Sequence, residues 1–360
     1  MLSDKYYYIL YPLFFICSVF FSFLINTLFL KFSKTLGIRN NTEPLIIRWG
    51  SQSKPAVGGI SFYILLLLSL AVYSIFFHPK QVFPNKEFIG FLLALNFGFL
   101  MGLADDAFNT RPFLKLFIQI LCGITLIASG IYIKVFSQDY MNYGLTIFWV
   151  VGIMNSINMI DNMDAISAII SVMVIMSALL IIFYLQDFSN IYFIALTGVL
   201  ASLIGFLILN WHPSKIYMGD TGSQFLGVFL ASIGIIYFWD FAPAERTIPI
   251  SESFILPVLV FMLPIVDTTI VVINRLSKGT SPFVGGKDHT THSLALLGMT
   301  DTWVAIIFAC ISVVNLFLVV LIIKYIPEFT TVHACLFFGY VLVFLGVMFY
   351  ISRRKNGDLK

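Results

Sequence analysis

The chain has 360 residues, of which 59% are hydrophobic and only 11% are charged. Its mean hydropathy of +0.95 excludes an ordinary soluble domain, because apolar segments long enough to cross a bilayer recur throughout. The net charge of +3 is less informative than the placement of the charges along the chain. We therefore predict a single membrane unit over residues 1–360, with no nucleic-acid partner.

Eleven apolar stretches predict membrane-spanning helices, so the expected fold is all-α and polytopic. They cover residues 6–30, 59–77, 87–104, 113–136, 144–158, 165–185, 190–209, 222–239, 251–274, 303–324 and 331–351. The first stretch is too long for the apolar core of a signal peptide and is interpreted as a span.

The distribution of basic residues predicts an orientation. If the N-terminus is outside, most of the 21 Lys and Arg residues fall in cytoplasmic segments, as the positive-inside rule requires. The C-terminus is then cytoplasmic. The cytoplasmic connections lie near residues 31–58, 105–112, 155–165, 210–222 and 275–302. Most of the polar motifs lie in these connections, so we expect the chemistry on one face of the membrane.

A pair of carboxylates, Asp105 and Asp106, ends the third apolar stretch, and Arg111 and Lys115 open the next. Acidic groups at bilayer depth are costly and usually functional. The cluster therefore predicts a site for a cation, a phosphate or both.

The short fifth stretch ends in amides and carboxylates, Asn155, Asn158, Asp161 and Asp164. Spacings of three and four put several of them on one helical face. Such a face suits a polyhydroxylated ligand or a nucleoside. A helix cap with interhelical hydrogen bonds is the alternative interpretation.

The connection after the seventh stretch begins at Asn210 and continues through Tyr217 to Gly219-Asp-Thr-Gly-Ser223. Its glycines let the backbone approach a ligand closely, and Asp220 offers the hard oxygen ligands that magnesium prefers. Tyr217 can stack on a base. A glycine-rich turn capped by Asp220 is the structural alternative. His212 is interpreted as an interfacial packing residue rather than a ligand.

The ninth stretch contains Asp267, which we expect to pair with a cation or with Arg275, because an unpaired carboxylate in an apolar span is costly. A structural salt bridge is the alternative to a functional role. The following loop carries Lys287, His289 and His292. These residues predict a clamp for a phosphate or a sugar, since no cysteine or carboxylate pattern supports a zinc site.

In this order the motifs resemble those of the polyprenyl-phosphate N-acetylhexosamine-1-phosphate transferases, glycosyltransferase family 4. The matching elements are Lys54-Pro-Ala-Val-Gly-Gly59, Gly102-Leu-Ala-Asp-Asp106, Lys115-Leu-Phe-Ile-Gln119, Asn155–Asp164, Tyr217–Ser223, Pro264-Ile-Val-Asp267 and the His289–His292 loop. Without the other motifs, the connection that contains Lys54 would be interpreted only as a basic cytoplasmic loop that follows the positive-inside rule. The two spaced histidines are closer to the WecA/TagO type than to the MraY type, which has a run of three.

The resemblance implies transfer of a sugar 1-phosphate, with GlcNAc-1-phosphate as the leading candidate, from a UDP-sugar to undecaprenyl phosphate. UMP is released and a cell-envelope glycan is started. It implies Mg²⁺ as cofactor, with Mn²⁺ as the alternative ion. It also implies a bacterial inner-membrane protein embedded in the lipid bilayer, with a cytoplasmic active site, and leaves monomer and homodimer open.

The resemblance also assigns roles to residues. Asp105, Asp106 and Asp267 are implied as catalytic, and Asp220 as the metal ligand. For Asp105, a base, a group that places the lipid phosphate and a covalent nucleophile are all open. The implied substrate-binding residues are Lys54, Lys115, Asn155, Asn158, Asp161, Asp164, Asn210, Tyr217, Lys287, His289 and His292.

Two departures from the family pattern affect the prediction of the donor sugar. The family usually has Asp-Gly-x-Asp-Gly where this chain has Asp161-Asn-Met-Asp-Ala165. Alanine does not readily adopt left-handed backbone geometry, so we expect a different local turn. Ser293 follows His292 where the family often has arginine. Another UDP-N-acetylamino sugar is therefore the alternative donor.

A cation-coupled transporter that uses Asp105 and Asp267 is the alternative from another functional class. It is disfavoured because the carboxylates gather on one face and no inverted repeat is evident.

Overall fold

The computed structural model describes residues 4–33, 54–76, 85–188, 190–241, 249–281, 286 and 288–355. Within these ranges the regular structure is helical, apart from one isolated parallel bridge between Ala56 and Tyr217. The helices are α1 (Asp4–Ser33), α2 (Gly58–Phe76), α3 (Lys86–Phe108), α4 (Pro112–Ser129), α5 (Asp139–Ile160), α6 (Ile166–Leu185), α7 (Ile191–Asn210), α8 (Gly219–Gly234), the π-helical η1 (Ile235–Trp239), α9 (Ile250–Val260), α10 (Met262–Ser277), α11 (Thr290–Leu296), α12 (Asp301–Tyr325) and α13 (Thr331–Lys355).

Ten candidate spans are found in the described part of the chain, and α9 with α10 makes an eleventh if that bent pair crosses as one unit. Each of the eleven predicted stretches coincides with one of them. The prediction of an all-α, polytopic membrane protein is thus confirmed, and the orientation of its termini stays a prediction.

Two predicted spans differ from the helices observed. The stretch 113–136 ends early, at Ser129, because Gly130 takes φ 105° and caps α4. The stretch 251–274 is broken: α9 and α10 meet at an angle of 82°. Pro264 lies in the first turn of α10 and has no N–H to continue the hydrogen bonds of α9, which explains a break that hydropathy does not detect.

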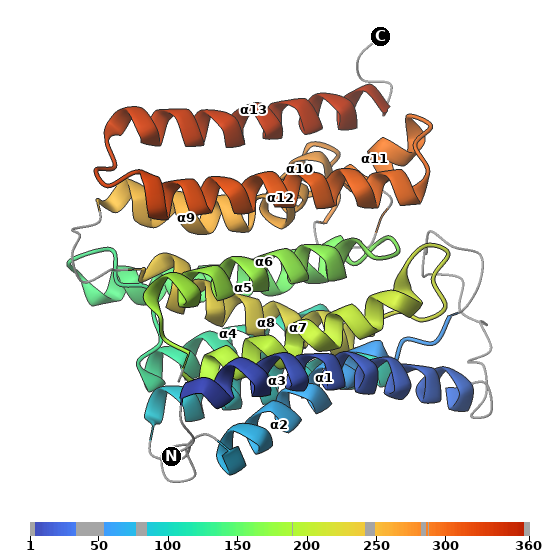
Figure 1. Ribbon diagram of the computed structural model, residues 1–360. Helices are drawn as coiled ribbons and strands as arrows, with labels where there is room; N and C mark the ends of the chain where they lie inside the picture. Colours follow the sequence, from blue (N-terminus) through green and yellow to red (C-terminus); the bar gives the residue numbers. More distant parts are fainter. Residues whose placement is uncertain are drawn as a thin grey trace.

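The helices form layers (Figure 1). α13 lies outermost, against α9, α10 and α11, and α12 packs on α6 and α9. On the opposite side α1 packs on α7 and α2. Between these layers α8 is the central helix, because the span that it forms with η1 is almost completely buried and α8 packs against neighbours that include α2, α3 and α5.

Small residues allow this close packing around α8. A Cβ on Gly102 of α3 would lie 2.2 Å from the backbone oxygen of Asp220, and one on Gly59 of α2 would lie 2.1 Å from the backbone nitrogen of Gly222. Membrane helices use such positions to bring backbones together. The contacts hold the N-terminal turn of α8 directly against α2 and α3.

Candidate active site

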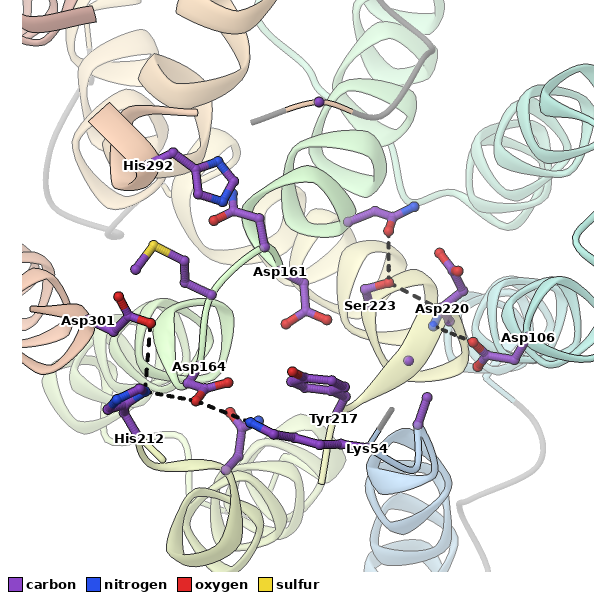
Figure 2. Close-up of a pocket in the computed structure, with 17 residues that line it drawn as sticks. Lys54, Asp106, Asp161, Asp164, His212, Tyr217, Asp220, Ser223, His292 and Asp301 are labelled. Atoms are coloured by element: carbon purple, nitrogen blue, oxygen red, sulfur yellow. Dashed lines mark hydrogen bonds and ion pairs between the residues drawn. The ribbon is translucent and has the colours of Figure 1, made fainter. Parts of the chain in front are cut away.

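One pocket collects polar side chains from the ends of several helices (Figure 2). Its volume of about 330 Å³ lies within the range of small-molecule sites. It is lined by Lys54, Ala56, Asp106, Asn158, Asp161, Asn162, Met163, Asp164, Asn210, His212, Tyr217, Gly219, Asp220, Ser223, Gly286, His292 and Asp301. Nine of the predicted site residues belong to this set, although they come from connections far apart in the sequence.

Asp106 caps the N-terminus of α8 from the neighbouring helix α3. Its carboxylate accepts hydrogen bonds from the backbone N–H groups of Asp220 and Thr221, at 3.0 and 2.8 Å, and from the Thr221 hydroxyl at 2.6 Å. Gly219 makes this approach feasible, because it has φ 73° and its Cβ would meet the Asp106 carboxylate at 2.6 Å. Asp106 therefore fixes the turn that presents Asp220 to the pocket.

Asp105 points in another direction and contacts Lys115. The Lys115 ammonium lies 2.5 Å from Asp105 and 3.3 Å from Asp220, so it bridges the two carboxylates. Asp105 also accepts hydrogen bonds from the backbone N–H and the hydroxyl of Thr110. Its side chain is 5% exposed, whereas that of Asp220 is 31% exposed. Neither Asp105 nor Lys115 lines the pocket; they support Asp220 from behind.

Asp161 occupies the middle of the pocket, between the labelled residues of Figure 2. Burial raises the pKa of its carboxyl to about 8, and the negative charges of Asp220, Asp106 and Asp164 add to the rise. Since no lysine or arginine contributes to this shift, the pocket has a surplus of negative charge around Asp161.

Tyr217 and Lys54 form one wall of the pocket through backbone pairing. The Tyr217 N–H donates to the Pro55 carbonyl at 2.9 Å, and the Gly58 N–H donates to the Tyr217 carbonyl at 3.0 Å. This pairing places the Lys54 ammonium 5.1 Å from the centroid of the Tyr217 ring, within the range of a cation–π contact. Lys54 also donates to the Ser214 hydroxyl at 2.9 Å.

Asp164 is the centre of a second polar network. It accepts from the Ser214 N–H at 3.0 Å and the Ser214 hydroxyl at 2.7 Å, and lies 3.0 Å from Nδ1 of His212 and 3.7 Å from Lys54. Burial opposes the charged form, but these hydrogen bonds and the Lys54 charge hold the pKa of Asp164 below its usual range. Asp164 is therefore a carboxylate at neutral pH.

His212 was interpreted as a packing residue, and the structure adds polar contacts to that interpretation. The side chain lines the pocket and is 38% exposed. Its Nδ1 lies 3.0 Å from Asp164 and 3.7 Å from Asp301, the first residue of α12. It thus connects two loops of the site.

Asn158 lines the pocket and accepts a hydrogen bond from the Ser223 hydroxyl at 3.3 Å. Asn155 lies elsewhere. Its amide exchanges two hydrogen bonds with Gln119, at 2.8 and 3.2 Å, and it does not line the pocket. The face of α5 that was predicted to carry ligands therefore has a pocket end and a packing end.

The turn that contains the departure from the family pattern has a left-handed residue, a conformation that we did not expect an alanine to adopt readily. Ala165 has φ 67°, and its N–H donates to the Asn210 amide oxygen at 3.0 Å. The Asn210 amide nitrogen donates to the Ile216 carbonyl at 2.8 Å. Both halves of this buried amide are thus used to join two loops, and they hold the alanine in its unfavourable conformation.

Of the two alternatives predicted for Asp267, a cation or Arg275, the contact with Arg275 is not found. Asp267 accepts from Nδ1 of His289 at 2.8 Å and from the N–H and hydroxyl of Thr290 at 2.7 and 2.6 Å. Arg275 instead forms a two-pronged ion pair with Asp288, at 2.8 Å for both contacts. His289 and Thr290 of the histidine loop thus lie against α10.

The two histidines have different surroundings as a result. His289 is bound to Asp267 and does not line the pocket, whereas His292 lines it. Lys287, the third predicted member of the clamp, lies outside the described residues, as does most of the predicted loop 31–58.

The described residues contain no cluster of three or more His, Cys, Asp or Glu side chains arranged to hold a metal ion. The chemistry of the donors nevertheless fits Mg²⁺, which proteins often bind through one or two carboxylates together with substrate phosphates. Asp220 and Asp161 both line the pocket. The raised pKa of Asp161 reflects a surplus of negative charge that a divalent cation reduces.

Several lining residues were not among the predicted site residues. His212 and Gly219 lie inside a motif that the sequence did single out, and their polar or glycine character at a helix end was an available signal. No feature of the sequence marked Asp301 as a site residue, because acidic residues are common in the first turn of a helix such as α12.

Comparison with known proteins supports the family. The profile of the family described as glycosyl transferase family 4 matches residues 88–238. The chain is 30% identical over 236 residues to a phospho-N-acetylmuramoyl-pentapeptide-transferase of Streptococcus agalactiae, covering 58% of this chain and 67% of the relative. It therefore belongs to glycosyl transferase family 4, as the motifs predicted.

Two further relatives carry different names. A probable undecaprenyl-phosphate N-acetylglucosaminyl 1-phosphate transferase of Bacillus subtilis is 26% identical over 266 residues, covering 68% of this chain and 67% of the relative. A phospho-N-acetylmuramoyl-pentapeptide-transferase of Streptococcus pneumoniae is 32% identical over 199 residues, covering 50% of this chain and 59% of the relative.

Proposed function

We propose that the protein transfers N-acetylglucosamine 1-phosphate from UDP-GlcNAc to undecaprenyl phosphate and releases UMP, which starts a cell-envelope glycan. The observation that carries this proposal is the single pocket in which residues of five separate family motifs meet. The Bacillus subtilis relative, whose name is probable undecaprenyl-phosphate N-acetylglucosaminyl 1-phosphate transferase, is matched over about two thirds of both chains.

The wall formed by Tyr217 and Lys54 is proposed to hold the uridine. The Tyr217 ring is 5.1 Å from the Lys54 ammonium and offers an apolar face for the base, since aromatic stacking stabilises bases without reading their sequence. Asn158 and Asp164 line the same pocket and offer hydrogen-bonding groups for the nucleoside. This end of the pocket accordingly binds the part of the donor that leaves as UMP.

The Asp220 end is proposed to hold the pyrophosphate. With Mg²⁺ bound by Asp220 and donor oxygens, the ion supplies charge neutralisation to the transferring phosphoryl group. Lys115 lies 3.3 Å from Asp220 and adds a fixed positive charge behind it. His292 also lines the pocket and is proposed to contact the sugar or its phosphate.

In the proposed reaction an oxygen of the lipid phosphate attacks the β-phosphorus of the donor. The bond from that phosphorus to the bridging oxygen breaks, and UMP leaves with the electron pair. The second pKa of a phosphate monoester is about 6, so the lipid phosphate is largely dianionic at neutral pH and has no proton to give up. Asp105 is proposed to hold Lys115 in place, since it contacts that ammonium at 2.5 Å, rather than to act as a base.

The pocket is proposed to open to the cytoplasm of a bacterial inner-membrane protein. The support is the placement of basic residues, which are concentrated in the connections that lead into the pocket. UDP-sugars are cytoplasmic donors, which agrees with this orientation.

The proposal is tested with the purified protein in detergent, supplied with undecaprenyl phosphate, Mg²⁺ and one donor at a time. UDP-GlcNAc, UDP-GalNAc and UDP-MurNAc-pentapeptide form the panel, and UMP and the lipid-linked sugar are both measured. We expect UDP-GlcNAc to give both products, EDTA to stop the reaction, and Mg²⁺ or Mn²⁺ to restore it. Folded protein that releases UMP from no donor would contradict the proposal. Cation flux in proteoliposomes without UMP release would favour a transporter.

A further inference from the structure

Asn162 occupies the position where the family pattern has glycine, and its side chain crosses between two loops of the site. The Asn162 amide nitrogen donates to the Met159 carbonyl at 2.9 Å, at the end of α5. Its amide oxygen accepts from the Thr291 hydroxyl at 2.7 Å, in the first turn of α11. Both halves of the amide are therefore used, and a glycine at this position has no group for either contact.

The neighbours of both partners line the pocket. Asp161 and Met163 flank Asn162, and His292 follows Thr291 directly; all three are lining residues. Figure 2 shows His292 and Asp161 projecting into the same space. Thr291 itself is fully buried, so its hydroxyl is shielded from water and its hydrogen bond has no competing solvent partner.

The other contacts of α11 hold it to its own side of the pocket. Asp267 binds His289 and Thr290 from α10, whereas the Asn162–Thr291 hydrogen bond joins α11 to the loop between α5 and α6. Another polar contact across the pocket, from His212 to Asp301 of α12, is longer at 3.7 Å and carries charge only when the histidine is protonated. The Asn162–Thr291 bond is thus the closer of the two.

We propose that Asn162 and Thr291 are positioning residues that dock α11 against the turn carrying Asp161 and thereby set the place of His292 in the donor pocket. Asparagine in place of glycine at this position thus adds a hydrogen bond between the loop that follows α5 and α11. This inference rests on the proposed function only for the identity of the donor.

The test compares Asn162→Gly, Thr291→Val and the double variant with the wild type in the UMP-release assay with UDP-GlcNAc. Loss of one buried hydrogen bond is expected to lower kcat/KM for the donor about three- to tenfold. The double variant is expected to lose no more than Asn162→Gly alone, because that variant already removes the bond to Thr291 together with the bond to Met159. KM for undecaprenyl phosphate is expected to stay unchanged.

Three further variants separate positioning from general destabilisation. Thr291→Ser keeps the hydroxyl and is expected to retain wild-type kcat/KM. Thr269→Val removes a threonine hydroxyl that bonds only within α10, to Ile265 at 2.7 Å, and is expected to leave donor kinetics unchanged. In a His292→Ala background, Thr291→Val is expected to add little further loss, since the bond acts through that histidine.

Hydrogen exchange over residues 290–296 gives a readout that does not depend on turnover. Faster exchange is expected in Asn162→Gly and Thr291→Val but not in Thr291→Ser. Wild-type kinetics and exchange in the two single variants would overturn the proposal, as would multiplying losses in the double variant or a Thr291→Ser variant as impaired as Thr291→Val. If the wild type releases no UMP, the proposed function fails, and the exchange data still decide whether the bond positions α11.

Discussion

Ala165 shows how a single residue is held in an unfavourable conformation by its surroundings. Left-handed geometry costs an alanine roughly 1–2 kcal/mol, yet φ is 67° here. The hydrogen bond to Asn210 and the complete burial of the neighbouring Ile166 leave the turn no other conformation. The site loop is therefore kept in shape at some cost in stability.

We predict that Ala165→Gly raises the stability of the protein. Relief of the left-handed strain exceeds the added entropy of the unfolded chain, and the expected net gain is about 0.5 kcal/mol. The measurement is thermal unfolding in detergent. Ala168→Gly, at a buried position within α6, serves as the control and should lose about 1 kcal/mol. A lower unfolding temperature for Ala165→Gly than for the wild type would show that the left-handed conformation of Ala165 does not cost stability.

Asp161 gives a prediction about pH. Its pKa is raised to about 8 in the folded protein, above the unfolded value of about 4. Between these values the folded state keeps a proton that the unfolded state has lost, so this group makes stability fall as pH rises. Above pH 8 both states are ionised and the dependence from this group ends.

In the metal-free protein, Asp161→Asn is therefore expected to flatten the decline of the unfolding temperature between pH 5 and pH 8. Asp139→Asn, at an exposed position at the start of α5, is the matched control and should follow the wild-type profile. Parallel profiles for wild type and Asp161→Asn would show that the carboxyl is already ionised in the folded state.

At the scale of elements, the N-terminus of α8 organises the end of the pocket that contains Asp220. Asp105 and Asp106 are adjacent in sequence, but successive residues of a helix point about 100° apart. One therefore reaches Lys115 and the other reaches the first N–H groups of α8. Sequence reasoning located the pair and left its division of labour open, because that division depends on which helix lies on each side.

We predict that Gly102→Ala disrupts this arrangement. The added Cβ meets backbone of α8 at 2.2 Å, so α3 and α8 must separate and Asp220 must shift. Overpacking of this kind costs about 1–3 kcal/mol, and we expect UMP release to fall at least tenfold. Gly152→Ala is the control, because its Cβ meets nothing within 4 Å. Equal activity of the two variants would show that α8 tolerates displacement from α3.

The bent pair α9–α10 shows where element prediction from hydropathy stops. The stretch 251–274 is apolar throughout and was assigned as one helix, but the chain turns by 82° at Phe261. That turn lets α10 present Asp267 to the histidine loop. Hydropathy shows which residues lie within the membrane but does not show where a helix bends. The Asp267–His289 contact, which depends on the bend, could therefore not be predicted.

For the whole molecule, the number and approximate limits of the spans were predictable, because each apolar stretch is long enough to cross the bilayer. The set of residues that meet in the pocket was predictable only through the family pattern. His212 and Asp301 were missed because their role comes from the approach of α12 to the connection before α8, and nothing in the sequence marks that approach.

The orientation of the whole molecule yields a labelling prediction. In a variant without native cysteines, Lys215→Cys lies in the connection between α7 and α8, and Asp139→Cys lies at the opposite end of the bundle, at the start of α5; both positions are exposed. In intact cells, after outer-membrane permeabilisation where required, we expect a membrane-impermeant maleimide to label only Asp139→Cys. Lys215→Cys should react after the inner membrane is opened. The reverse pattern would place the pocket outside.

The residues that line the pocket are spread over most of the sequence, and this has a consequence for the synthesis of the protein. Lining residues begin at Lys54 and end at Asp301, so the pocket is incomplete until α12 has entered the membrane. During synthesis the carboxylates near α3, α5 and α8 leave the ribosome long before the loop that carries His292. A nascent chain therefore lacks the part of the pocket lined by His292 and Asp301 until its last helices arrive, and interrupted synthesis yields an inactive protein rather than a partly active one.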